Sequence, residues 1–276
     1  MDQYCVIGNP VEHSRSPWIH ARFAELTGQA LQYSKKLVPL DGFAAALAAF
    51  RDDGGRGCNV TVPFKFDAAA VATQTTARGR LAQACNILRF DGEQLFADNT
   101  DGVGLVADIQ RHGGFPLAGR ELLLIGAGGA AAGVLGPLIE ARPHRIVVAN
   151  RTPDRAVALV LRHAALARAE GVALAELPLA GLGDSSFDVV INATATSLSG
   201  GSVPFPSSVL RRGALAYDLM YGPAARPFMD WARAHGAVPR DGMGMLVEQA
   251  AEAFFVWRGV RPPVAQVLSE LRASLA

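Results

Sequence analysis

The sequence predicts an α/β protein with two domains, each containing a mainly parallel sheet. Short β-type runs alternate with alanine-rich helical segments along the whole chain, which is the pattern of βαβ connections. A glycine-rich turn near the middle follows an apolar run and opens a helical segment. The chain of 276 residues also exceeds the roughly 150 residues of a typical domain.

The composition excludes several classes of protein. Lys and Arg total 26 and Asp and Glu 25, so the chain lacks the basic surface that nucleic acid or an anionic membrane requires. Hydrophobic residues make up 50% and charged residues 18%, which is typical of a folded chain rather than a disordered one. We therefore expect neither nucleic acid nor a membrane as a partner. The sequence leaves the oligomeric state, monomer or homodimer, open.

The N-terminus and the cysteines bear on the cellular location. Residues 1–4 contain no basic segment leading into an apolar one, so we expect no secretory signal and a cytoplasmic protein. The three cysteines, Cys5, Cys58 and Cys85, form neither a CxxC pair nor a zinc spacing. We expect buried free thiols and no metal site.

The first domain is expected over residues 1–101. Ser16 is expected to cap a helix that carries Pro17 in its first turn. Glycines and prolines punctuate the remaining elements, and an Asp-Gly turn indicates a hairpin. The expected strands are residues 4–7, 33–38 and 58–62, the expected helices are 18–26 and 43–50, and the hairpin joins 87–90 to 94–97.

The second domain is expected over residues 102–240, and a strongly helical segment fills residues 241–276. Periodicity alone does not decide where that last segment packs. The clearest pattern is a βαβ unit, followed by further strands. The unit consists of a strand at 122–125, a turn at 126–129, a helix at 130–141 and a strand at 146–149, and the further strands are 189–191 and 215–217.

Residues 122–139 contain no charged or polar side chain and on length alone resemble a membrane-spanning helix. Five glycines and Pro137 interrupt this run, so strand, turn and helix describe it better. The turn fits G-x-G-x-x-A, in which backbone N–H groups approach a pyrophosphate at a helix N-terminus. A tight turn without a ligand is the alternative. The candidate cofactor residues of the turn are Gly126, Ala127, Gly128, Gly129 and Ala130.

The end of the second βαβ strand indicates which dinucleotide binds. An NAD site usually has Asp or Glu here, about 20 residues past the glycines, for the ribose 2′-hydroxyl. This chain has Asn150, Arg151 and Thr152, with Arg155 nearby, and arginine can bind a 2′-phosphate. We therefore predict NADP as the cofactor. The alternative is that Thr152 only caps the next helix and Arg151 is solvated.

Polar residues of the first domain form a candidate catalytic group. Asn59 and Thr61 are two apart on a strand and share a face, and Lys65 follows the Pro63 break. Asp101 is a suitable carboxylate partner for Lys65 if the fold brings their segments together. Such a pair suits proton transfer during hydride transfer at a carbonyl. The alternative is an ordinary surface lysine.

Several motifs along nearly the whole chain resemble those of the shikimate dehydrogenase family. Residues 8–17 (GNPVEHSRSP) are similar to the family's N-terminal substrate motif, and residues 59–65 (NVTVPFK) to its catalytic-lysine motif. Residues 99–101 (NTD) resemble the catalytic-aspartate motif, and residues 241–249 (DGMGMLVEQ) the C-terminal signature. The presence of all four in this order is far more specific than the glycine turn.

The resemblance implies reversible, NADP-dependent reduction of 3-dehydroshikimate to shikimate in aromatic amino-acid biosynthesis. It also implies that the C-terminal helices return to the first domain. Lys65 and Asp101 would be catalytic, and Ser14 and Ser16 would bind the substrate carboxylate. The other implied substrate contacts are Thr61, Asn86, Tyr221 and Gln249, and Leu219 and Gly242 would lie near the nicotinamide.

The sequence departs from the family pattern around the implied substrate residue Asn86. The family's Gly-Ala-x-Asn-Thr stands here as Gln83-Ala84-Cys85-Asn86-Ile87, and Arg226 replaces a usual threonine. A quinate/shikimate dehydrogenase or a related paralogue is the alternative within the enzyme class. From another class, the alternative is a dinucleotide-sensing regulator without turnover, since a Rossmann unit alone does not imply catalysis.

Overall fold

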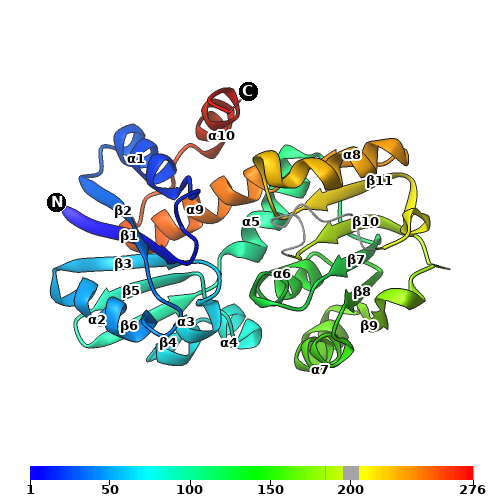
Figure 1. Cartoon of the computed structure of the whole chain (residues 1–276), viewed down its shortest axis with the longest axis horizontal. Coiled ribbons are helices and arrows are strands. Elements are labelled where there is room, and N and C mark those ends of the chain that lie inside the picture. Colours follow the sequence, from blue (N-terminus) through cyan, green and yellow to red (C-terminus); the bar gives the residue numbers. More distant parts are fainter. Residues whose placement is uncertain (184, 195–204, 276) are drawn as a thin grey trace. The chain divides into compact units, whose positions relative to one another are not determined.

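The computed structural model describes residues 1–183, 185–194 and 205–275, and it divides into two compact units (Figure 1). Unit 1 comprises Met1–Gly104 and Leu246–Ala276, and unit 2 comprises Leu105–Met245. The first boundary lies three residues after the expected limit at 101/102, and the second lies five residues after the expected limit at 240/241. Both observed boundaries lie inside helices, α5 (Asp101–Ala107) and α9 (Met243–Arg258).

The elements alternate between strands and helices through both units. Unit 1 contains β1 (Asp2–Gly8), α1 (Ser16–Thr27), β2 (Leu31–Leu37), α2 (Phe43–Asp52), β3 (Gly55–Val60), α3 (Lys65–Val71), β4 (Gln74–Thr75), α4 (Ala77–Ala82), β5 (Ile87–Asp91), β6 (Gln94–Asp98) and α10 (Val264–Ala273). Unit 2 contains β7 (Glu121–Ile125), α6 (Gly129–Glu140), β8 (Arg145–Asn150), α7 (Pro153–Glu170), β9 (Ala173–Pro178), β10 (Phe187–Asn192), β11 (Leu210–Asp218), α8 (Arg226–Ala234) and β12 (Val238–Arg240).

The sheet of unit 1 has the strand order β2-β1-β3-β5-β6-β4. Strands β1, β2 and β3 are parallel, β5 runs antiparallel to β3, and β6 runs antiparallel to β5. The carboxyl ends of β1, β3 and β6 therefore meet the amino end of β5 along one edge of the sheet. Segments far apart in the sequence are brought together at this edge.

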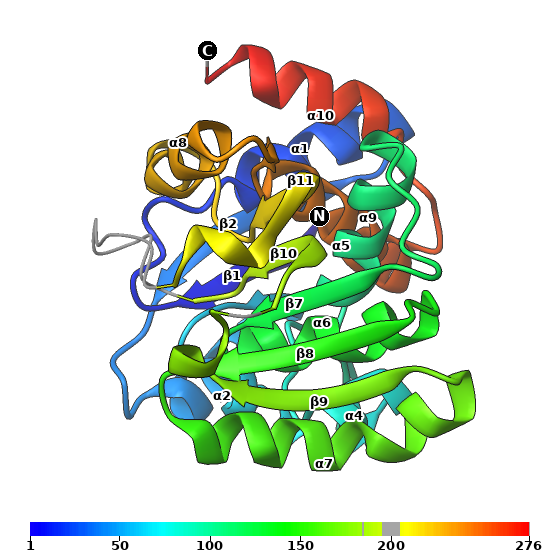
Figure 2. The same cartoon turned by 90° about the vertical axis from the view of Figure 1, so that its right-hand side faces the viewer.

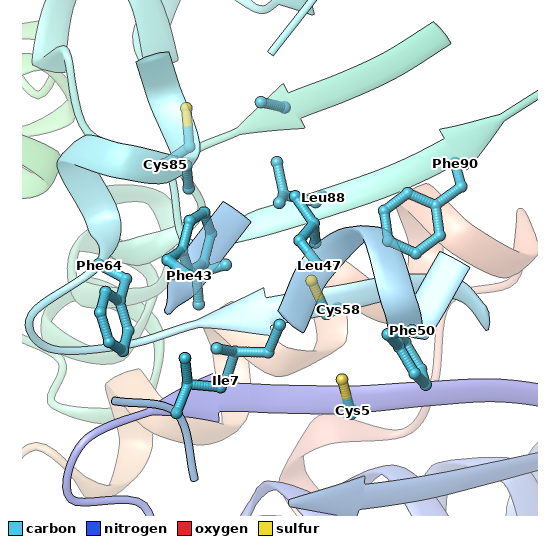
Figure 3. Packing of buried hydrophobic residues seen from close by; sticks show 14 residues of the cluster. Cys5, Ile7, Phe43, Leu47, Phe50, Cys58, Phe64, Cys85, Leu88 and Phe90 are labelled. Carbon is cyan, nitrogen blue, oxygen red and sulfur yellow. The ribbon is translucent and has the colours of Figure 1, made fainter. Parts of the chain in front are cut away.

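One face of this sheet carries a core of aromatic and aliphatic side chains (Figure 3). Phe43 of α2 stacks on Phe64, with ring centroids 5.2 Å apart. Burying a phenylalanine contributes about 1.5–3 kcal/mol. Phe64 is the residue directly before α3, so its burial fixes the position of Lys65, the first residue of that helix.

The C-terminal helix α9 belongs to unit 1 from Leu246 onward, as expected for helices that return to the first domain. Trp257 of α9 stacks on Tyr4 of β1 at 4.6 Å and donates from Nε1 to the carbonyl of Leu88 at 3.0 Å. A Cβ at Gly57 would stand 2.7 Å from that nitrogen, so only glycine leaves room for the ring. These contacts hold the helix that carries Gln249.

Unit 2 contains a six-stranded sheet in the order β12-β11-β10-β7-β8-β9, with parallel neighbours throughout. Figure 2 shows β10, β7, β8 and β9 side by side in that order. The chain crosses from β7 toward β8 on one side and returns to β10 on the other. This reversal is the switch point at which doubly wound sheets bind ligands.

The apolar run over residues 122–139 forms strand β7, a glycine turn and most of α6, as predicted. Its strand is completely buried, and residues 131–139 of α6 are buried as well, which accounts for the lack of polar side chains. Within the described residues, no helix is both long and apolar enough to cross a membrane.

The structure corrects one local prediction and adds elements that the sequence pattern did not reveal. Ser16 is not the helix cap: Arg15 occupies the N-cap position, and Ser16 is the first helical residue, followed by Pro17. The added elements include α3, β4, α4, β9, α8 and β12. Most of them are short, and the strands β9 and β12 lie at sheet edges, where hydrophobic patterning is weak.

Candidate active site

A buried ion pair joins two residues of the candidate catalytic group. Lys65 begins α3 and Asp101 begins α5, and Nζ of Lys65 lies 2.5 Å from Oδ2 of Asp101. The two side chains are 12% and 7% exposed. The structure therefore brings the two segments together as the prediction required, and the surface alternative for Lys65 is wrong.

Asn86 occupies the other side of Asp101. Its Nδ2 atom lies 2.8 Å from Oδ1 of Asp101 and 3.2 Å from Oε1 of Gln249. Its Oδ1 atom accepts a 2.8 Å hydrogen bond from the backbone N–H of Thr100. Although the residues flanking Asn86 depart from the family pattern, its amide lies in direct contact with both Asp101 and Gln249. The sequence did not single out Thr100.

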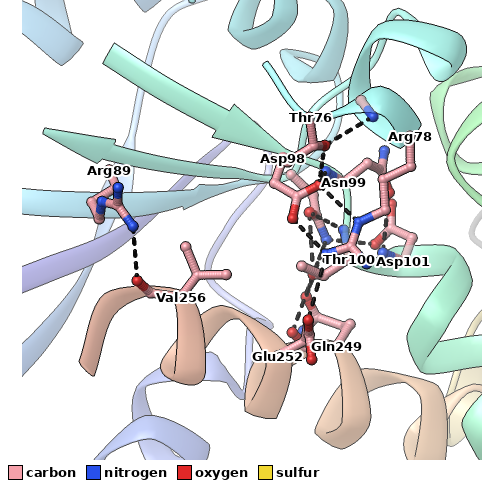
Figure 4. A network of polar contacts seen from close by, with 12 residues as sticks. Thr76, Arg78, Arg89, Asp98, Asn99, Thr100, Asp101, Gln249, Glu252 and Val256 are labelled. Carbon is pink, nitrogen blue, oxygen red and sulfur yellow. Dashed lines mark hydrogen bonds and ion pairs between the residues drawn. The ribbon is translucent and has the colours of Figure 1, made fainter. Parts of the chain in front are cut away.

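A second layer of polar contacts supports the segment that carries Asp101 (Figure 4). Arg78 of α4 binds both oxygens of the buried Asp98 carboxylate, at 2.8 and 2.5 Å. Glu252 of α9 lies 3.5 Å from the same guanidinium. A buried carboxylate must be paired, so Asp98 needs such a cation. No sequence signal pointed to Arg78, because it lies on α4, a helix that was not predicted, and its partner stands twenty residues away.

The two serines of the N-terminal motif lie close together at the start of α1. Ser14 Oγ lies 3.2 Å from Ser16 Oγ and accepts from the backbone N–H of Ser16 at 3.3 Å. They follow the carboxyl end of β1, on the same edge of the sheet as Lys65. Paired hydroxyls near a helix N-terminus can hydrogen-bond a carboxylate.

Asn59 and Thr61 extend the polar edge between these groups. Asn59 donates from Nδ2 to the carbonyl of Asn86 at 3.2 Å and accepts from the Tyr33 hydroxyl at 2.7 Å. Thr61 packs against Gly8, where a Cβ would stand 2.3 Å from its methyl group. No sequence pattern pointed to Tyr33, because its partner comes from a different strand.

The turn after β7 has the geometry of an anion site. Gly126 has φ +116°, and a Cβ there would stand 2.8 Å from the carbonyl of Ala193. Strand β7 is buried up to this point, whereas residues 127–130 are partly or fully exposed at the start of α6. The free N–H groups and helix dipole favour a bound phosphate.

The residues after β8 lie beside this turn, since β7 and β8 are paired and Gly126 donates to the carbonyl of Ala149 at 2.8 Å. Asn150 closes the loop by donating to the carbonyl of Thr152 at 2.8 Å. The Thr152 side chain makes no cap hydrogen bond, which contradicts a purely capping role. Arg151 and Arg155 are exposed and form no ion pair with any described residue.

The remaining candidates of unit 2 follow β11 and β12. Gly242 donates to the carbonyl of Met220 at 2.8 Å, and a Cβ at Gly242 would stand 2.2 Å from the carbonyl oxygen of Leu219. Leu219 and Gly242 are therefore in backbone contact. Tyr221 directly precedes a short 3₁₀ turn, Gly222–Ala225, and is half-buried.

The three cysteines are free and completely buried, as predicted. Burial, together with the carboxylates of Asp98 and Asp101, raises the pKa of Cys85 to about 12. Burial and the neighbouring Cys5 thiol also raise the pKa of Cys58. Neither thiol is available as a nucleophile at neutral pH.

Three family models match the chain. The shikimate dehydrogenase substrate binding domain matches residues 6–88, the shikimate / quinate 5-dehydrogenase family matches residues 109–199, and the shikimate 5'-dehydrogenase C-terminal domain matches residues 242–272. Together these segments contain most of the candidate residues of both units.

Similar proteins cover the whole chain. A shikimate dehydrogenase (NADP(+)) of Paracidovorax citrulli is 68% identical over 99% of this chain and 98% of its own length, and that of Acidovorax sp. (strain JS42) is 66% identical over 100% and 97%. The structure of a shikimate 5-dehydrogenase from Thermus thermophilus, solved in complex with NADP(H) and shikimate, is 31% identical, with a TM-score of 0.86 and full coverage of both chains. This full-length similarity shows that the chain belongs to the shikimate dehydrogenase family.

Proposed function

We propose that the protein catalyses the reversible, NADP-dependent reduction of 3-dehydroshikimate to shikimate. The buried Lys65–Asp101 pair carries the proposal, because reducing a carbonyl to an alcohol needs a positioned proton source. The names of relatives at 66–68% identity support the substrate and the cofactor. A small-molecule substrate and a cytoplasmic location are part of the same proposal.

NADP fits the residues of unit 2. The N–H groups of Ala127, Gly128, Gly129 and Ala130 at the start of α6 would hold the pyrophosphate, and Gly126 would form the turn that presents them. Arg151 and Arg155, with Asn150 and Thr152 beside them, would bind the 2′-phosphate, because Asn150 stands at the end of β8 where an NAD site usually has a carboxylate. Leu219 and Gly242 would lie against the nicotinamide.

Shikimate fits the polar edge of unit 1. Ser14 and Ser16 would bind its carboxylate through their hydroxyls. Thr61, Asn86 and Gln249 would hold ring hydroxyls, and Tyr221 of unit 2 would line the substrate side. Because Asn86 already contacts both Asp101 and Gln249, one amide would link substrate binding to the catalytic pair.

Bound NADPH supplies the hydride that reduces the substrate carbonyl carbon. The carbonyl oxygen would gain a proton from the Lys65–Asp101 pair and so become the alcohol hydroxyl. In the reverse direction the pair would accept that proton. Asp101 holds the Lys65 ammonium within 2.5 Å, so the donor is fixed before the substrate binds. The low exposure of both side chains limits competition from water.

A spectrophotometric assay tests the proposal. We expect NADPH formation from shikimate and NADP, followed by the absorbance of the reduced nicotinamide, slower reaction with quinate, and a higher KM for NAD than for NADP. Equal or lower KM values for NAD would contradict the cofactor assignment. Turnover of quinate at the rate of shikimate would favour the quinate/shikimate enzyme, and no turnover with any pair would favour a sensor.

A further inference from the structure

One buried carboxylate in unit 2 is bound by side chains from two neighbouring strands. Asp108 follows α5 in a π-helical turn, Asp108–His112, and is completely buried. Arg240 binds both of its oxygens, Nε to Oδ2 at 2.8 Å and Nη2 to Oδ1 at 2.5 Å. The Tyr217 hydroxyl donates to Oδ2 at 2.7 Å. The candidate cofactor and substrate residues do not include any of these three.

The sheet register explains why both donors reach the same carboxylate. Tyr217 and Arg240 are paired residues of the parallel strands β11 and β12. Paired residues of neighbouring strands project from the same face of the sheet. Strand β12 is an edge strand of only three residues, so few backbone hydrogen bonds hold it. The Asp108 carboxylate therefore fixes β12 against β11.

The carboxylate also contacts the beginning of α9. A Cβ at Gly244 would stand 1.8 Å from Oδ1 of Asp108, so the carboxylate fills the space that a side chain would need. Burial, and next the charge of Asp108, raise the pKa of the Tyr217 hydroxyl. This hydroxyl therefore keeps its proton and remains a hydrogen-bond donor. The contact with Asp108 raises the pKa of Arg240.

The two residues that bind Asp108 lie close in sequence to the candidate nicotinamide residues. Leu219 lies two residues after Tyr217, and Gly242 lies two residues after Arg240. These two loops are in backbone contact, since Gly242 donates to Met220 and packs against the Leu219 carbonyl. A shift of β12 relative to β11 would move one side of this contact against the other.

We propose that Asp108 is a positioning residue for hydride transfer: by binding Tyr217 and Arg240 together, it fixes the Leu219 and Gly242 backbones against which the nicotinamide is held. The proposal rests on the proposed function, since it needs Leu219 and Gly242 to contact the cofactor. A misplacement of about 1 Å at a hydride donor can reduce the rate about 100-fold, because the reacting atoms must meet at near-contact distance.

The test compares Asp108→Asn with a control at the opposite end of strand β11. Asp188 on β10 pairs with Arg211 on β11 at 2.9 Å, near the amino ends of the strands, so Asp188→Asn also removes one charge from a carboxylate–arginine pair. Tyr217→Phe is a milder second variant that removes a single hydroxyl. Each is assayed for kcat, both KM values, melting temperature, and the kinetic isotope effect with NADPH deuterated at the transferred position.

For Asp108→Asn we expect kcat to fall about 10- to 100-fold, the KM for shikimate to change little, and the deuterium isotope effect to rise because hydride transfer becomes rate-limiting. Tyr217→Phe should show the same changes to a smaller degree. Asp188→Asn should lower the melting temperature and leave kcat and the isotope effect unchanged.

Two outcomes would overturn the proposal while wild-type turnover upholds the proposed function. One is an Asp108→Asn enzyme with a lower melting temperature and unchanged kcat and isotope effect. The second applies if Asp108→Asn does not fold: a Tyr217→Phe enzyme with unchanged kcat and an unchanged isotope effect. An inactive wild-type enzyme would instead overturn the proposed function.

Discussion

Lys65 and Asn86 bind different oxygens of the same carboxylate: Lys65 Nζ lies 2.5 Å from Oδ2 of Asp101, and Asn86 Nδ2 lies 2.8 Å from Oδ1. The backbone N–H of Asp101 in turn donates to Asn99 Oδ1 at 3.0 Å. The carboxylate is thus fixed from two sides and its backbone from a third. Its orientation relative to Lys65 is set by the fold before any ligand binds.

Lys65→Ala should lower kcat by roughly 10²–10⁴-fold, the usual contribution of a positioned acid or base. The effect on KM for shikimate should be smaller, since the lost interaction acts mainly in the transition state. Steady-state kinetics with shikimate and NADP measure both. Lys36→Ala, on β2 of the same sheet, is the control and should retain the wild-type rate. An unchanged turnover number in Lys65→Ala would rule out the catalytic assignment.

Asn86→Asp should change the pH dependence of the reaction. The new carboxylate would face Asp101, and two neighbouring carboxylates raise the pKa of the pair because they repel each other when both are ionised. We expect the acidic limb of the kcat/KM profile to move up by about 1–2 pH units. Asn86→Ala removes the hydrogen bond to Asp101 without adding charge, so it should lower the rate and move the limb up by less than Asn86→Asp does. Identical profiles for the two variants would exclude this electrostatic effect.

Arg151→Ala should weaken NADP binding selectively. An arginine–phosphate contact contributes about 1.5–3 kcal/mol, so the KM for NADP should rise about 10- to 100-fold. The KM for NAD, which has no 2′-phosphate, should change little. Arg168→Ala, in the last turn of the helix α7 that follows the Arg151 loop, is the control that removes the same charge far from this loop. Equal changes with both cofactors would show that Arg151 does not recognise the phosphate.

The sequence predicted the parts of the fold that depend on local periodicity. The strand, glycine turn and helix from residue 122 onward are visible because a buried parallel strand and its turn each have a distinct composition. The contact of Lys65 with Asp101 could be anticipated only conditionally, since it depends on the pairing of β3, β5 and β6. Sheet order, unlike strand position, is not encoded locally.

The supporting contacts could not be predicted for a related reason. Asp98 and Arg78, like Asp108 and Arg240, are ion pairs whose partners lie 20 and 132 residues apart. A charged residue in a sequence normally indicates an exposed position, and only the fold shows that Asp98 and Asp108 are buried. The long-range networks around the site are therefore the part that required the structure.

The cysteines should be unreactive in the folded enzyme. All three are completely buried, and the pKa of Cys85 is raised to about 12, so almost no thiolate forms near neutral pH. Incubation with iodoacetamide at pH 8 should leave activity and intact mass unchanged over hours, whereas the protein in urea should gain three carbamidomethyl groups. Loss of activity together with labelling of Cys58 or Cys85 in the native protein would contradict this expectation.

His20 should make the stability of the protein depend on pH. Its ring is completely buried and stacks on Tyr33 with centroids 4.4 Å apart. Burial lowers the pKa of His20 to about 3, against a value near 6.5 in the unfolded chain. Between these values the unfolded state binds a proton that the folded state does not, so the free energy of unfolding decreases as the pH falls below 6.5.

His20→Phe keeps an aromatic ring against Tyr33 and removes the titrating group. The difference in free energy of unfolding between the variant and the wild type, measured by urea denaturation, should be constant above pH 7. Below about pH 6 it should grow in favour of the variant by about 1.4 kcal/mol per pH unit, the value for one proton. Because all other groups are common to both proteins, their contributions cancel in this difference. Parallel curves from pH 7 to pH 4 would mean that the folded protein protonates His20 as readily as the unfolded chain does.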